Sequence, residues 1–486
     1  MLHEELARQI ALEMPHTPTQ EQLQTLISLG KFILTPLPHH AFVLRGYAGT
    51  GKTTLVGALV KVMKKIQRNV VLLAPTGRAA KVFSAHANET AYTIHKVIYR
   101  QQTFNGEDTR FSLGYNKNPH TLFIVDEASM IPLHSGGSSI FGSGSLLNDL
   151  LQYVYETEGC RIIFVGDIAQ LPPVSEEASP ALNRQTLKTF GLHITECDLT
   201  KVVRQDDTSG VLANATRLRE LLSEETFRLP SIQVKEKGEV RLLPGNELIE
   251  TLISSYTEHS TEGTIVITRS NKRANIYNNG IRNRIFDRED ILTRGDLVMA
   301  VKNNYYWTEQ LRNTLPKEEK LKFDFIANGD IAEIVRIRNV HTLYGFHFAD
   351  ATLCFPDYDN FEMEVRVLLD TLTSESPSLT SEESNHLFEA ILEDYADIPT
   401  KKERMKRLRE DPYYNALQIK YAYAVTCHKA QGGQWAHVYV DQGYITEDMA
   451  NSSYLRWLYT AFTRTTDRIY LVNWPKEQSI QLEDKE

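Results

Sequence analysis

The sequence predicts an α/β protein with two units, each built on a parallel sheet. Three observations lead to this prediction. Short apolar runs alternate with amphipathic helical stretches, which is the pattern of parallel α/β sheets. Several of these runs end in polar clusters, and ligands bind at the carboxyl ends of strands in such sheets. At 486 residues the chain also exceeds a single hydrophobic core, so two to four domains are expected.

The first polar cluster is a glycine-rich loop from Gly46 to Thr53 that fits G-x-x-x-x-G-K-[ST]. The apolar run 41–44 precedes it as a short strand, and residues 54–66 follow as an amphipathic helix. Glycines let backbone N–H groups turn inward around phosphate oxygens, and the helix directs its positive end at the anion. The loop therefore predicts binding of a nucleoside triphosphate. The residues expected to contact it here are Gly46, Gly49, Thr50, Gly51, Lys52, Thr53 and Thr54.

Two more strands of the first unit end in residues suited to phosphate chemistry. The run 121–125 ends in Asp126 and Glu127, of which the first can hold Mg²⁺ and the second can deprotonate an attacking water. The run 161–165 leads to Gly166-Asp167 and to Gln170, which two prolines follow. A glutamine at such a position can sense a γ-phosphate, although a rigid turn is the simpler interpretation. Together with strand 70–74, these runs predict one sheet with its site at one edge.

Upstream of the loop, Thr19 and Gln22 fit a capping box at the start of a helix. That structural role is the more common one for such a pair. A glutamine just before a phosphate loop can also read adenine, because its amide both donates and accepts hydrogen bonds. Both interpretations remain open, and Gln20 is a weaker alternative register for the second.

Two segments interrupt the strand–helix alternation of the first unit. Residues 100–119 are polar with interspersed aromatic residues, and we expect an inserted hairpin there, with a surface loop as the alternative. Residues 134–145 are rich in glycine and serine and are expected to be mobile.

The second unit is predicted to begin near residue 200, with a strand at 264–268 and a helix at about 270–285. From residue 295 to about 370 the pattern changes to short strand-like runs, which indicates a small inserted β-barrel. Residues 371–415 are polar and helical, and the basic run 401–409 is interpreted as a solvated helix face. The α/β pattern resumes at Tyr421 and ends with the strand 468–472.

Composition narrows the functional classes only slightly. The formal net charge of −9 is mild evidence against a nucleic-acid binder, although a local groove matters more than the sum. The four cysteines form no C-x-x-C pair, so neither a zinc site nor an iron–sulfur cluster is suggested from them. No apolar run has the length of a membrane span or a signal peptide, so a cytoplasmic location without a membrane partner is expected.

Two arginines are candidates for the positive charge that phosphoryl transfer requires. Arg204 lies in the segment Val202–Gln205, and Arg464 follows a helix whose apolar residues would hold it in place. Taken alone, each of them would more often be a surface arginine.

The ordered set of motifs resembles superfamily 1 DNA helicases, and most closely the RecD-like and Dda-like branch. In this sequence the matching motifs are GYAGTGKTT (46–54), APTGRAA (74–80), TIH (93–95), VDEAS (125–129), GDIAQLPPV (166–174), VVRQ (202–205), VTCHKAQGGQ (425–434) and YTAFTRTTD (459–467). A single one would be weak support, whereas eight in the family's order form a specific signal. The segments 100–119 and 295–415 match poorly and are assigned by position alone.

The resemblance implies a role for each matching residue. Gln22 resembles the adenine-reading glutamine, Lys52 the phosphate lysine, and Thr53 and Asp126 the Mg²⁺ ligands. The remaining catalytic positions by resemblance are Glu127 as the base, Gln170 as the γ-phosphate sensor, and Arg204 and Arg464 as the arginines from the second domain; Gly432 is expected near the nucleotide. The positions that resemble single-stranded DNA contacts are Pro75, Thr76, Arg78, His95, Thr426, His428 and Lys429, with Arg78 and Lys429 as weaker candidates.

The resemblance also implies an architecture and a function. It implies two RecA-like domains, at 1–198 and at 199–294 with 416–486, a strand-separating hairpin at 100–119, and an SH3-like barrel within the insert 295–415. The expected function is an ATP-dependent DNA helicase that uses ATP and Mg²⁺, with single-stranded and forked DNA as partners. Repair or replication proteins are further expected partners, and the motor is expected to be monomeric. The 5′→3′ direction follows from the resemblance alone.

Three alternatives remain open at this point. The protein could be a single-strand translocase that does not unwind duplexes, or a nucleotide-gated DNA clamp or subunit with weak turnover. A P-loop kinase or transport ATPase is a third alternative that the motifs after Gly166 disfavour.

Overall fold

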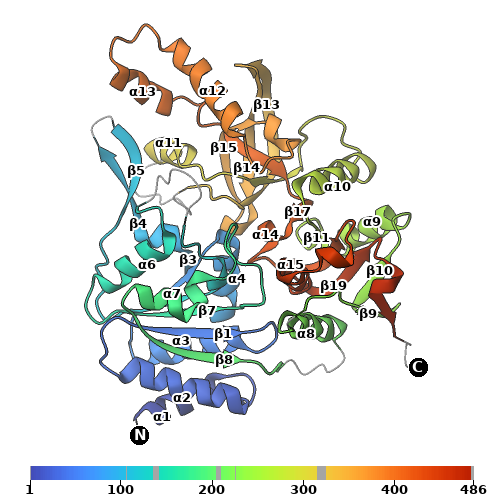
Figure 1. Ribbon diagram of the computed structural model, residues 1–486. Helices are drawn as coiled ribbons and strands as arrows, with labels where there is room; N and C mark the ends of the chain where they lie inside the picture. The colour runs from blue at the N-terminus through green and yellow to red at the C-terminus, as the bar shows by residue number, and fades with distance from the viewer. Residues whose placement is uncertain are drawn as a thin grey trace.

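The computed structural model describes residues 2–104, 107–134, 142–203, 209–224, 226–314 and 325–482, with the backbone alone for the part of 101–111 within these ranges. Arg204 and the glycine- and serine-rich residues 135–141 lie outside the described ranges, so the predictions made for them stay predictions. The rest of the chain forms two α/β units, a hairpin and a barrel (Figure 1).

The first α/β unit is built on a six-stranded, all-parallel sheet in the order β3-β2-β6-β7-β1-β8. Its strands are β1 (His40–Gly46), β2 (Val70–Ala74), β3 (Ala91–Thr93), β6 (Leu122–Val125), β7 (Arg161–Gly166) and β8 (His193–Leu199). Alternate residues of β1 enter different cores, with Phe42 and Leu44 on one face and Ala41 and Val43 on the other. Because both faces are covered, the strands are apolar throughout, as the sequence indicated.

Helices cover both faces of this sheet. One core contains α1 (Leu2–Glu13), α2 (Gln20–Leu34), α3 (Lys52–Lys65) and α4 (Gly77–Ala87). The other contains α5 (Ile94–Ile98), α6 (Leu146–Tyr155) and α7 (Arg184–Thr189). Each polar cluster predicted for this unit therefore lies at the carboxyl edge of one sheet.

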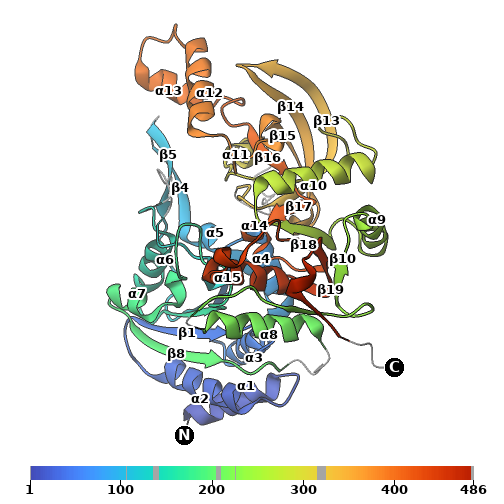
Figure 2. The same cartoon turned by 45° about the vertical axis from the view of Figure 1, so that its right-hand side comes forward.

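The predicted hairpin is present between α5 and β6. Strands β4 (Tyr99–Phe104) and β5 (Glu107–Leu113) pair antiparallel, from Tyr99 opposite Leu113 to Phe104 opposite Glu107. Figures 1 and 2 show the pair rising from the first α/β unit toward two helices of the insert, α12 (Ser381–Asp394) and α13 (Lys401–Arg409). Tyr115, just after the hairpin, is 60% exposed.

The second α/β unit has a five-stranded parallel sheet in the order β10-β19-β18-β11-β17. Its strands are β10 (Val240–Leu243), β11 (Thr264–Thr268), β17 (Ala424–Thr426), β18 (Trp435–Asp441) and β19 (Thr465–Val472). The helices are α8 (Gly210–Leu222), α9 (Leu248–His259), α10 (Asn271–Arg284), α14 (Cys427–Ala430) and α15 (Ser452–Phe462), and a short parallel pair joins β9 (Ile232–Val234) to β20 (Ser479–Gln481). The predicted α/β class is thus confirmed for both units.

The insert contains a closed five-stranded barrel, as expected. Its strands are β12 (Leu297–Ala300), β13 (Ile331–Leu343), β14 (Phe346–Phe355), β15 (Phe361–Leu368) and β16 (Leu417–Tyr421). The last strand was not anticipated, because Tyr421 was assigned to the resumed α/β pattern. β16 pairs antiparallel with β12 and parallel with β15, and this double pairing closes the barrel across the intervening helical segment.

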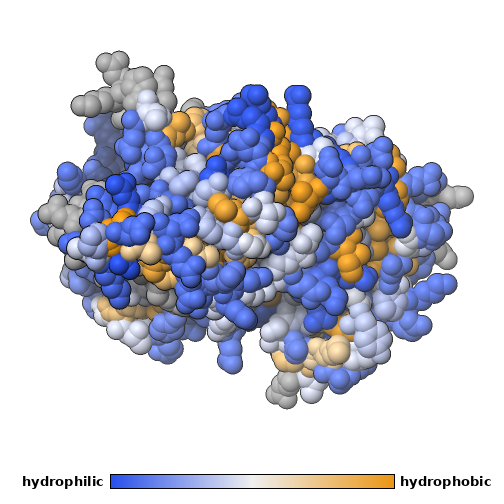
Figure 3. Space-filling model, turned by 90° about the horizontal axis from the view of Figure 1, so that it is seen from above, coloured by the Kyte–Doolittle hydropathy of each residue, from blue (hydrophilic) through white to orange (hydrophobic). Residues whose placement is uncertain are grey.

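Helices α11 (Tyr306–Thr314), α12 (Ser381–Asp394) and α13 (Lys401–Arg409) belong to the same insert. Leu387, Ile391 and Leu408 pack with Phe346 and Phe348 of the barrel, while Lys401, Lys402 and Lys406 of α13 are exposed, as predicted for a solvated helix face. Seen from above, this side of the molecule is mostly hydrophilic, with hydrophobic side chains in short bands (Figure 3). Among the described helices, none combines the length and apolar character needed to cross a bilayer.

Candidate active site

The glycine-rich loop joins β1 to α3 in the conformation that the motif requires. Gly49 and Gly51 have φ angles of +77° and +82°, a region that side-chain-bearing residues rarely adopt. A Cβ atom at Gly51 would also lie 2.6 Å from the side-chain nitrogen of Gln22. The glycines are therefore needed for both the turn and the close packing beneath it.

Lys52 is the first residue of α3, and its side chain folds back over the loop. Its ammonium donates hydrogen bonds to the carbonyl oxygens of Gly46 at 2.6 Å and of Tyr47 at 2.8 Å. These two carbonyl oxygens keep the positive charge of the Lys52 side chain next to the loop. The dipole of α3 adds positive potential at the same point, so the loop forms an anion site.

Gln22 makes the capping box and at the same time supports the loop. Its side-chain oxygen accepts from the Thr19 N–H at 3.0 Å, and its nitrogen donates to the Thr50 carbonyl at 3.1 Å. The side chain is buried and also lines the cavity described below. The capping interpretation is thus confirmed, while contact with adenine stays a prediction.

Asp126 and Glu127 follow β6 and face the loop. The Glu127 N–H donates to Asp126 Oδ1 at 2.9 Å, and Glu127 has a left-handed backbone with φ of 49°. A non-glycine residue in that region is strained, and such strain is concentrated at functional sites. Burial and the neighbouring charge of Glu127 raise the pKa of Asp126 to about 7. A cation bound here would relieve this penalty, so the carboxylate fits a metal ligand.

Asp167 and Gln170 follow β7 at the same sheet edge. Burial raises the pKa of Asp167, although it accepts hydrogen bonds from the Ala169 N–H and from Tyr459. The side-chain oxygen of Gln170 is buried and has no hydrogen-bond partner among the described residues. Native structures rarely leave such an acceptor unpaired, so this oxygen is available to a donor inside the cavity.

Arg464 reaches this group of residues from the second α/β unit. It follows α15, is 4% exposed, and places Nη1 at 3.9 Å from Glu127 Oε1. Its guanidinium is held by the carbonyl oxygens of Thr460 and Gly433, each at 3.2 Å. The tertiary structure therefore brings a predicted arginine from residue 464 next to a carboxylate at residue 127.

Helix α15 forms further bonds across the contact between the two α/β units, which we call the seam. The Tyr459 hydroxyl accepts from the Ala48 N–H at 2.9 Å and donates to Asp167 Oδ2 at 2.6 Å. Thr460 Oγ1 accepts from the Leu171 N–H at 2.9 Å. Helix α15 is therefore hydrogen-bonded to both the phosphate loop and the loop after β7.

These residues enclose a cavity of about 390 Å³ at the seam. Its lining from the first α/β unit includes Gln22, Gly49, Gly51, Lys52, Thr53, Thr54, Asp126, Glu127 and Gln170, and from the second unit Leu212, Gln434 and Arg464. Sequence reasoning missed Tyr459 and Asp167 as functional residues, although both stand inside the motifs it used. For Tyr459 the available signal was a polar hydroxyl on an otherwise apolar helix, which the packing of α15 on the loop explains.

Replacing Tyr459 with Phe should weaken the seam. The change removes the donor to one oxygen of the buried Asp167 and the acceptor of the half-buried Ala48 N–H, at a cost of about 1–3 kcal/mol for an unpaired buried group. We expect a lower Tm and a lower affinity for ATP than in the wild type, measured by thermal unfolding and equilibrium binding. Tyr444→Phe, at a side chain that is 83% exposed, is the control. Equal behaviour of the two variants would contradict a role for Tyr459 at the seam.

A second group of predicted residues lies at the carboxyl ends of β2 and β17. Thr76 caps α4 by accepting from the Ala79 N–H at 3.2 Å, and Thr426 directly precedes α14. Gly432 was expected near the nucleotide, but its Cα faces Thr76 and Ala79, with an added Cβ at 3.2 Å and 3.0 Å from them. Gly432 is not among the described residues that line the cavity, and its approach to the nucleotide stays a prediction.

Two residues of the predicted DNA-contact group, His95 and Lys429, contact residues of the insert that contains the barrel. The rings of His95 and Phe325 lie 6.1 Å apart, and the Lys429 ammonium donates to Asn328. Burial lowers the pKa of His95 to about 4 and that of Lys429 to about 8. His428 is exposed and Pro75 is half-buried. The insert therefore borders the residues predicted to contact DNA, which the sequence did not show.

Arg78, a weaker candidate for DNA contact, lies at the seam. Its guanidinium stacks on Trp435 with the central carbon 4.1 Å from the ring centroid, and it donates to the Gln434 carbonyl at 3.4 Å. A cation–π contact of this kind holds α4 against β18. Whether Arg78 also contacts DNA stays a prediction.

Asp330 in the barrel gives the contact with α4 a pH dependence. Burial raises its pKa to about 7, although it accepts from Ala327 N–H and from Tyr358, whose hydroxyl lies over Gly77. The unfolded value is about 3.9, so the folded state binds more protons between pH 4 and pH 7. The stability gained from this protonation is full below pH 4 and is lost as the pH rises through 7.

Asp330→Asn should remove this dependence. Between pH 5 and pH 8 the free energy of unfolding of the wild type should fall relative to the variant by about 2–3 kcal/mol. Chemical denaturation across this pH range measures the difference. Asp397→Asn, at an exposed position in the insert, should follow the wild type. Parallel pH profiles for the wild type and Asp330→Asn would contradict the raised pKa.

Two family models match the chain. The model described as "AAA domain" matches residues 34–229, and the model described as "UvrD-like helicase C-terminal domain" matches residues 421–472. The first match contains the loop, both carboxylates and Gln170, and the second contains Arg464. Both walls of the cavity are therefore covered by the two matches.

Relatives of this chain include three proteins of different lengths. The "Uncharacterized protein R530" of Acanthamoeba polyphaga mimivirus is 23% identical, over a match that covers 89% of this chain and 95% of the relative. The ATP-dependent RecD2 DNA helicase of Deinococcus radiodurans is 34% identical, over a match that covers 28% of this chain and 16% of the relative. The ATP-dependent DNA helicase dda of Enterobacteria phage T4 is 25% identical, over a match that covers 54% of this chain and 56% of the relative. The chain thus spans less than two thirds of the two characterised helicases.

Among solved structures, one described as "Structural Basis for DNA Unwinding at Forked dsDNA by two coordinating Pif1 helicases" covers 96% of this chain and 94% of its own, at 16% identity with a TM-score of 0.46.

Proposed function

We propose that this chain is a superfamily 1 DNA helicase of the branch of RecD, Dda and Pif1, and that it converts ATP hydrolysis at the seam into movement along single-stranded DNA. The observation that carries this proposal is the approach of Arg464 to Glu127, 3.9 Å across the seam. Chemistry that needs residues from both units is coupled to their relative position.

In this proposal ATP occupies the cavity at the seam. The N–H groups of the loop and the Lys52 ammonium would bind the phosphates, and Lys52 would exchange the carbonyls of Gly46 and Tyr47 for phosphate oxygens. Gln22 supports the loop from below and would face the base. Thr53 and Asp126 would hold one Mg²⁺ ion, which when bound neutralises phosphate charge. The Thr53 hydroxyl and the buried Asp126 carboxylate are both oxygen ligands, which Mg²⁺ prefers.

Residues from both α/β units would take part in hydrolysis. Glu127 would orient and deprotonate the attacking water, and the unpaired oxygen of Gln170 would accept a hydrogen bond from that water. Arg464 would stabilise the charge that develops on the γ-phosphate. Arg204 lies outside the described residues, and we retain it as a second arginine on the strength of the family resemblance.

The movement would follow from the bonds of α15. Tyr459 and Thr460 connect the second unit to the phosphate loop and to the loop that carries Gln170. Loss of the γ-phosphate would change the positions of both loops and hence the docking of α15. Thr76 and Thr426, at sheet edges of the two units, would then contact the DNA backbone alternately.

We propose Pro75, Thr76, His95, Thr426, His428 and Lys429 as DNA contacts, with Arg78 as a weaker candidate. They come from both α/β units and, at His95 and Lys429, border the barrel. Contacts to phosphates combined with base stacking predict binding that tolerates sequence and weakens with salt. The domain bounds follow the resemblance, except that β16 (Leu417–Tyr421) belongs with the barrel.

A duplex-unwinding helicase is favoured over a translocase without unwinding by one element. The β4–β5 hairpin projects from the first unit as a candidate wedge between strands (Figure 2). The direction 5′→3′, a monomeric motor, a cytoplasmic location, and repair or replication partners complete the proposal by resemblance to the family.

Unwinding of 5′-tailed and 3′-tailed duplexes, side by side and with or without ATP, tests the function. We expect ATP-dependent strand separation on the 5′-tailed substrate only, and ATPase activity that rises with single-stranded DNA. Deletion of residues 103–113 should abolish unwinding and leave the ATPase intact. ATP turnover that ignores added DNA would support a nucleotide-gated clamp instead.

A further inference from the structure

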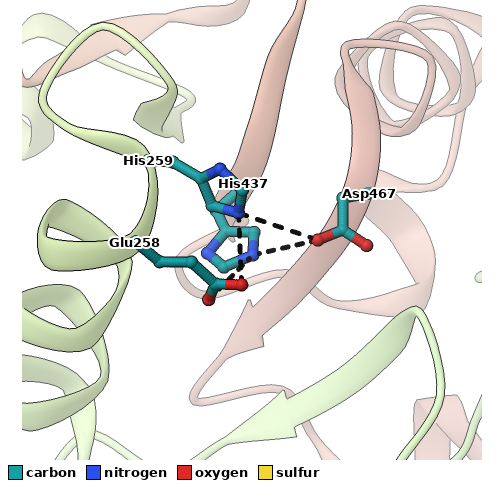
Figure 4. A group of neighbouring side chains, drawn as sticks. All are labelled: Glu258, His259, His437 and Asp467. Carbon is teal, nitrogen blue, oxygen red and sulfur yellow. Dashed lines mark hydrogen bonds and ion pairs between the residues drawn. The ribbon is translucent and has the colours of Figure 1, made fainter.

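Four side chains with metal-binding groups converge in the second α/β unit. They are Glu258 and His259 at the end of α9, His437 in β18 and Asp467 in β19, and Figure 4 shows them pointing toward one another. All four lie in the described part of the chain and apart from the residues that line the nucleotide cavity. The fold brings them together because β18 and β19 are neighbouring parallel strands and α9 packs on the same sheet.

One ligand atom from each of the four residues lies within 4.8 Å of the other three, so the four side chains can surround one small cation. His437 Nε2 lies 3.3 Å from Asp467 Oδ2 and 4.0 Å from Glu258 Oε2. His259 Nε2 lies 3.5 Å from Glu258 Oε1 and 3.9 Å from Asp467 Oδ2. A tetrahedral Zn²⁺ site with bonds of about 2.0–2.2 Å separates its ligand atoms by about 3.3–3.6 Å. To reach this geometry the ligand atoms would draw closer together, with a single oxygen of Glu258 facing the ion.

A chain of hydrogen bonds fixes which nitrogen of His437 faces the cluster unprotonated. The Tyr439 hydroxyl donates to the Thr251 carbonyl at 2.9 Å, so Ser255, 2.6 Å away, must donate to Tyr439. Ser255 then accepts from His437 Nδ1–H at 2.8 Å. In the neutral imidazole, Nε2 therefore turns a lone pair toward the carboxylate of Asp467.

Two acceptors that face each other at 3.3 Å need a proton or a cation between them. A proton would make His437 a buried imidazolium, and with 1% exposure this charged form is disfavoured. His259 adds a second nitrogen, since its Nε2 is buried and without a hydrogen-bond partner in the described structure. Two nitrogens thus point into the cluster, one of them a lone-pair acceptor in the neutral His437 ring.

Arg468 is the other charged side chain at the cluster. Its guanidinium lies 3.5 Å from Glu258 Oε2 and 3.8 Å from Asp467 Oδ2. Each carboxylate offers about four lone-pair positions, so an arginine and a metal ion can share it. Such outer partners orient metal-binding carboxylates. A cavity of about 730 Å³ lined by Glu258, His437 and Arg468 connects the cluster to solvent.

We propose that Glu258, His259, His437 and Asp467 bind one Zn²⁺ ion, which fastens the end of α9 to β18 and β19. Two imidazoles with two carboxylates form a donor set that suits Zn²⁺ better than Mg²⁺ or Ca²⁺, which prefer oxygen ligands. The ion would be structural, because the four protein ligands complete its tetrahedral coordination. The proposal does not depend on the helicase function, although β19 begins directly after Arg464.

The test uses full-length, tag-free protein stripped with a chelator and then titrated with Zn²⁺. Excess Mg²⁺ is present to suppress binding of Zn²⁺ at Asp126 and Glu127. Calorimetry should give one Zn²⁺ per chain, and Co²⁺ in its place should give the visible absorption of a tetrahedral site. At a hundredfold excess over Kd, the Tm of the whole chain should rise by about 2–3 °C.

His259→Gln and Asp467→Asn, at partly exposed side chains, should each lower Zn²⁺ affinity at least tenfold and remove the rise in Tm. If either variant fails to fold, Glu258→Gln serves in its place. The control is the double variant His347→Gln, Asp370→Asn, which removes an exposed histidine–carboxylate pair elsewhere and should keep wild-type binding. The absence of stoichiometric Zn²⁺ binding, equal binding by all variants, or an equal rise in Tm with Mg²⁺ alone would overturn the proposal.

Discussion

Glu127→Gln should bind ATP about as tightly as the wild type and hydrolyse it about 10²–10⁴-fold more slowly. General acid–base catalysis contributes a factor of this size, and an amide does not accept the proton of the attacking water. The side chain is 23% exposed, faces the nucleotide cavity and lies on a strained backbone, so its removal changes the chemistry more than the packing. Single-turnover hydrolysis and equilibrium binding of a fluorescent nucleotide measure the two effects separately.

The matched control is Glu156→Gln, at an exposed position after α6 in the same unit, which should turn over at the wild-type rate. Lys52→Ala should also lose hydrolysis, because its binding of the phosphates is weakened. Its affinity for ATP should therefore be lower than that of Glu127→Gln. Normal turnover in Glu127→Gln would remove this residue from the role of base and would direct attention to Asp167.

Arg464→Ala is expected to lower DNA-stimulated ATPase activity by about 10³-fold or more while binding of single-stranded DNA is largely retained. An arginine that stabilises the transferring phosphoryl group contributes 10³–10⁵ in rate. Because Arg464 is supplied by the second α/β unit, its loss should also uncouple hydrolysis from the docking of α15. The ATPase rate at saturating DNA and DNA affinity by fluorescence anisotropy are the measurements.

Since Arg464 is buried, the alanine variant needs a companion that keeps volume and charge. Arg464→Lys retains a cation but not the planar fork that bonds Thr460 and Gly433, and it should lose most of the activity as well. Arg284→Ala, at an exposed site on α10, is the control and should be active. Loss of DNA binding with intact ATPase in Arg464→Ala would assign the residue to a different surface.

The parts of the fold that depend on local pattern could be predicted. Both parallel sheets, the hairpin and the existence of the barrel follow from periodicity and from the change to short strand-like runs near residue 295. The fifth barrel strand, β16, was missed because its partners β12 and β15 are separated from it by the helical segment 371–415. Pairing across such a distance has no signal in the local sequence.

The candidate site divides in the same way. The grouping of Lys52, Thr53, Asp126 and Glu127 around one cavity could be predicted, because the pattern of a phosphate loop is encoded within a strand and its following turn. The neighbours of Gly432, which are Thr76 and Ala79, could not be predicted, since a motif places a residue near a region but does not determine its contacts.

The amino-acid sequence by itself determined the α/β class of the protein, the loop predicted to bind phosphate, and the identity of the residues predicted around it. Only the tertiary structure decided that Arg464 stands 3.9 Å from Glu127, that Tyr459 links Ala48 to Asp167, and that two histidines and two carboxylates meet beside β18. The physical reason is that local conformation is set by neighbouring residues, whereas these contacts depend on how separate units pack together. A side chain on one unit has no partner until the other unit is in place.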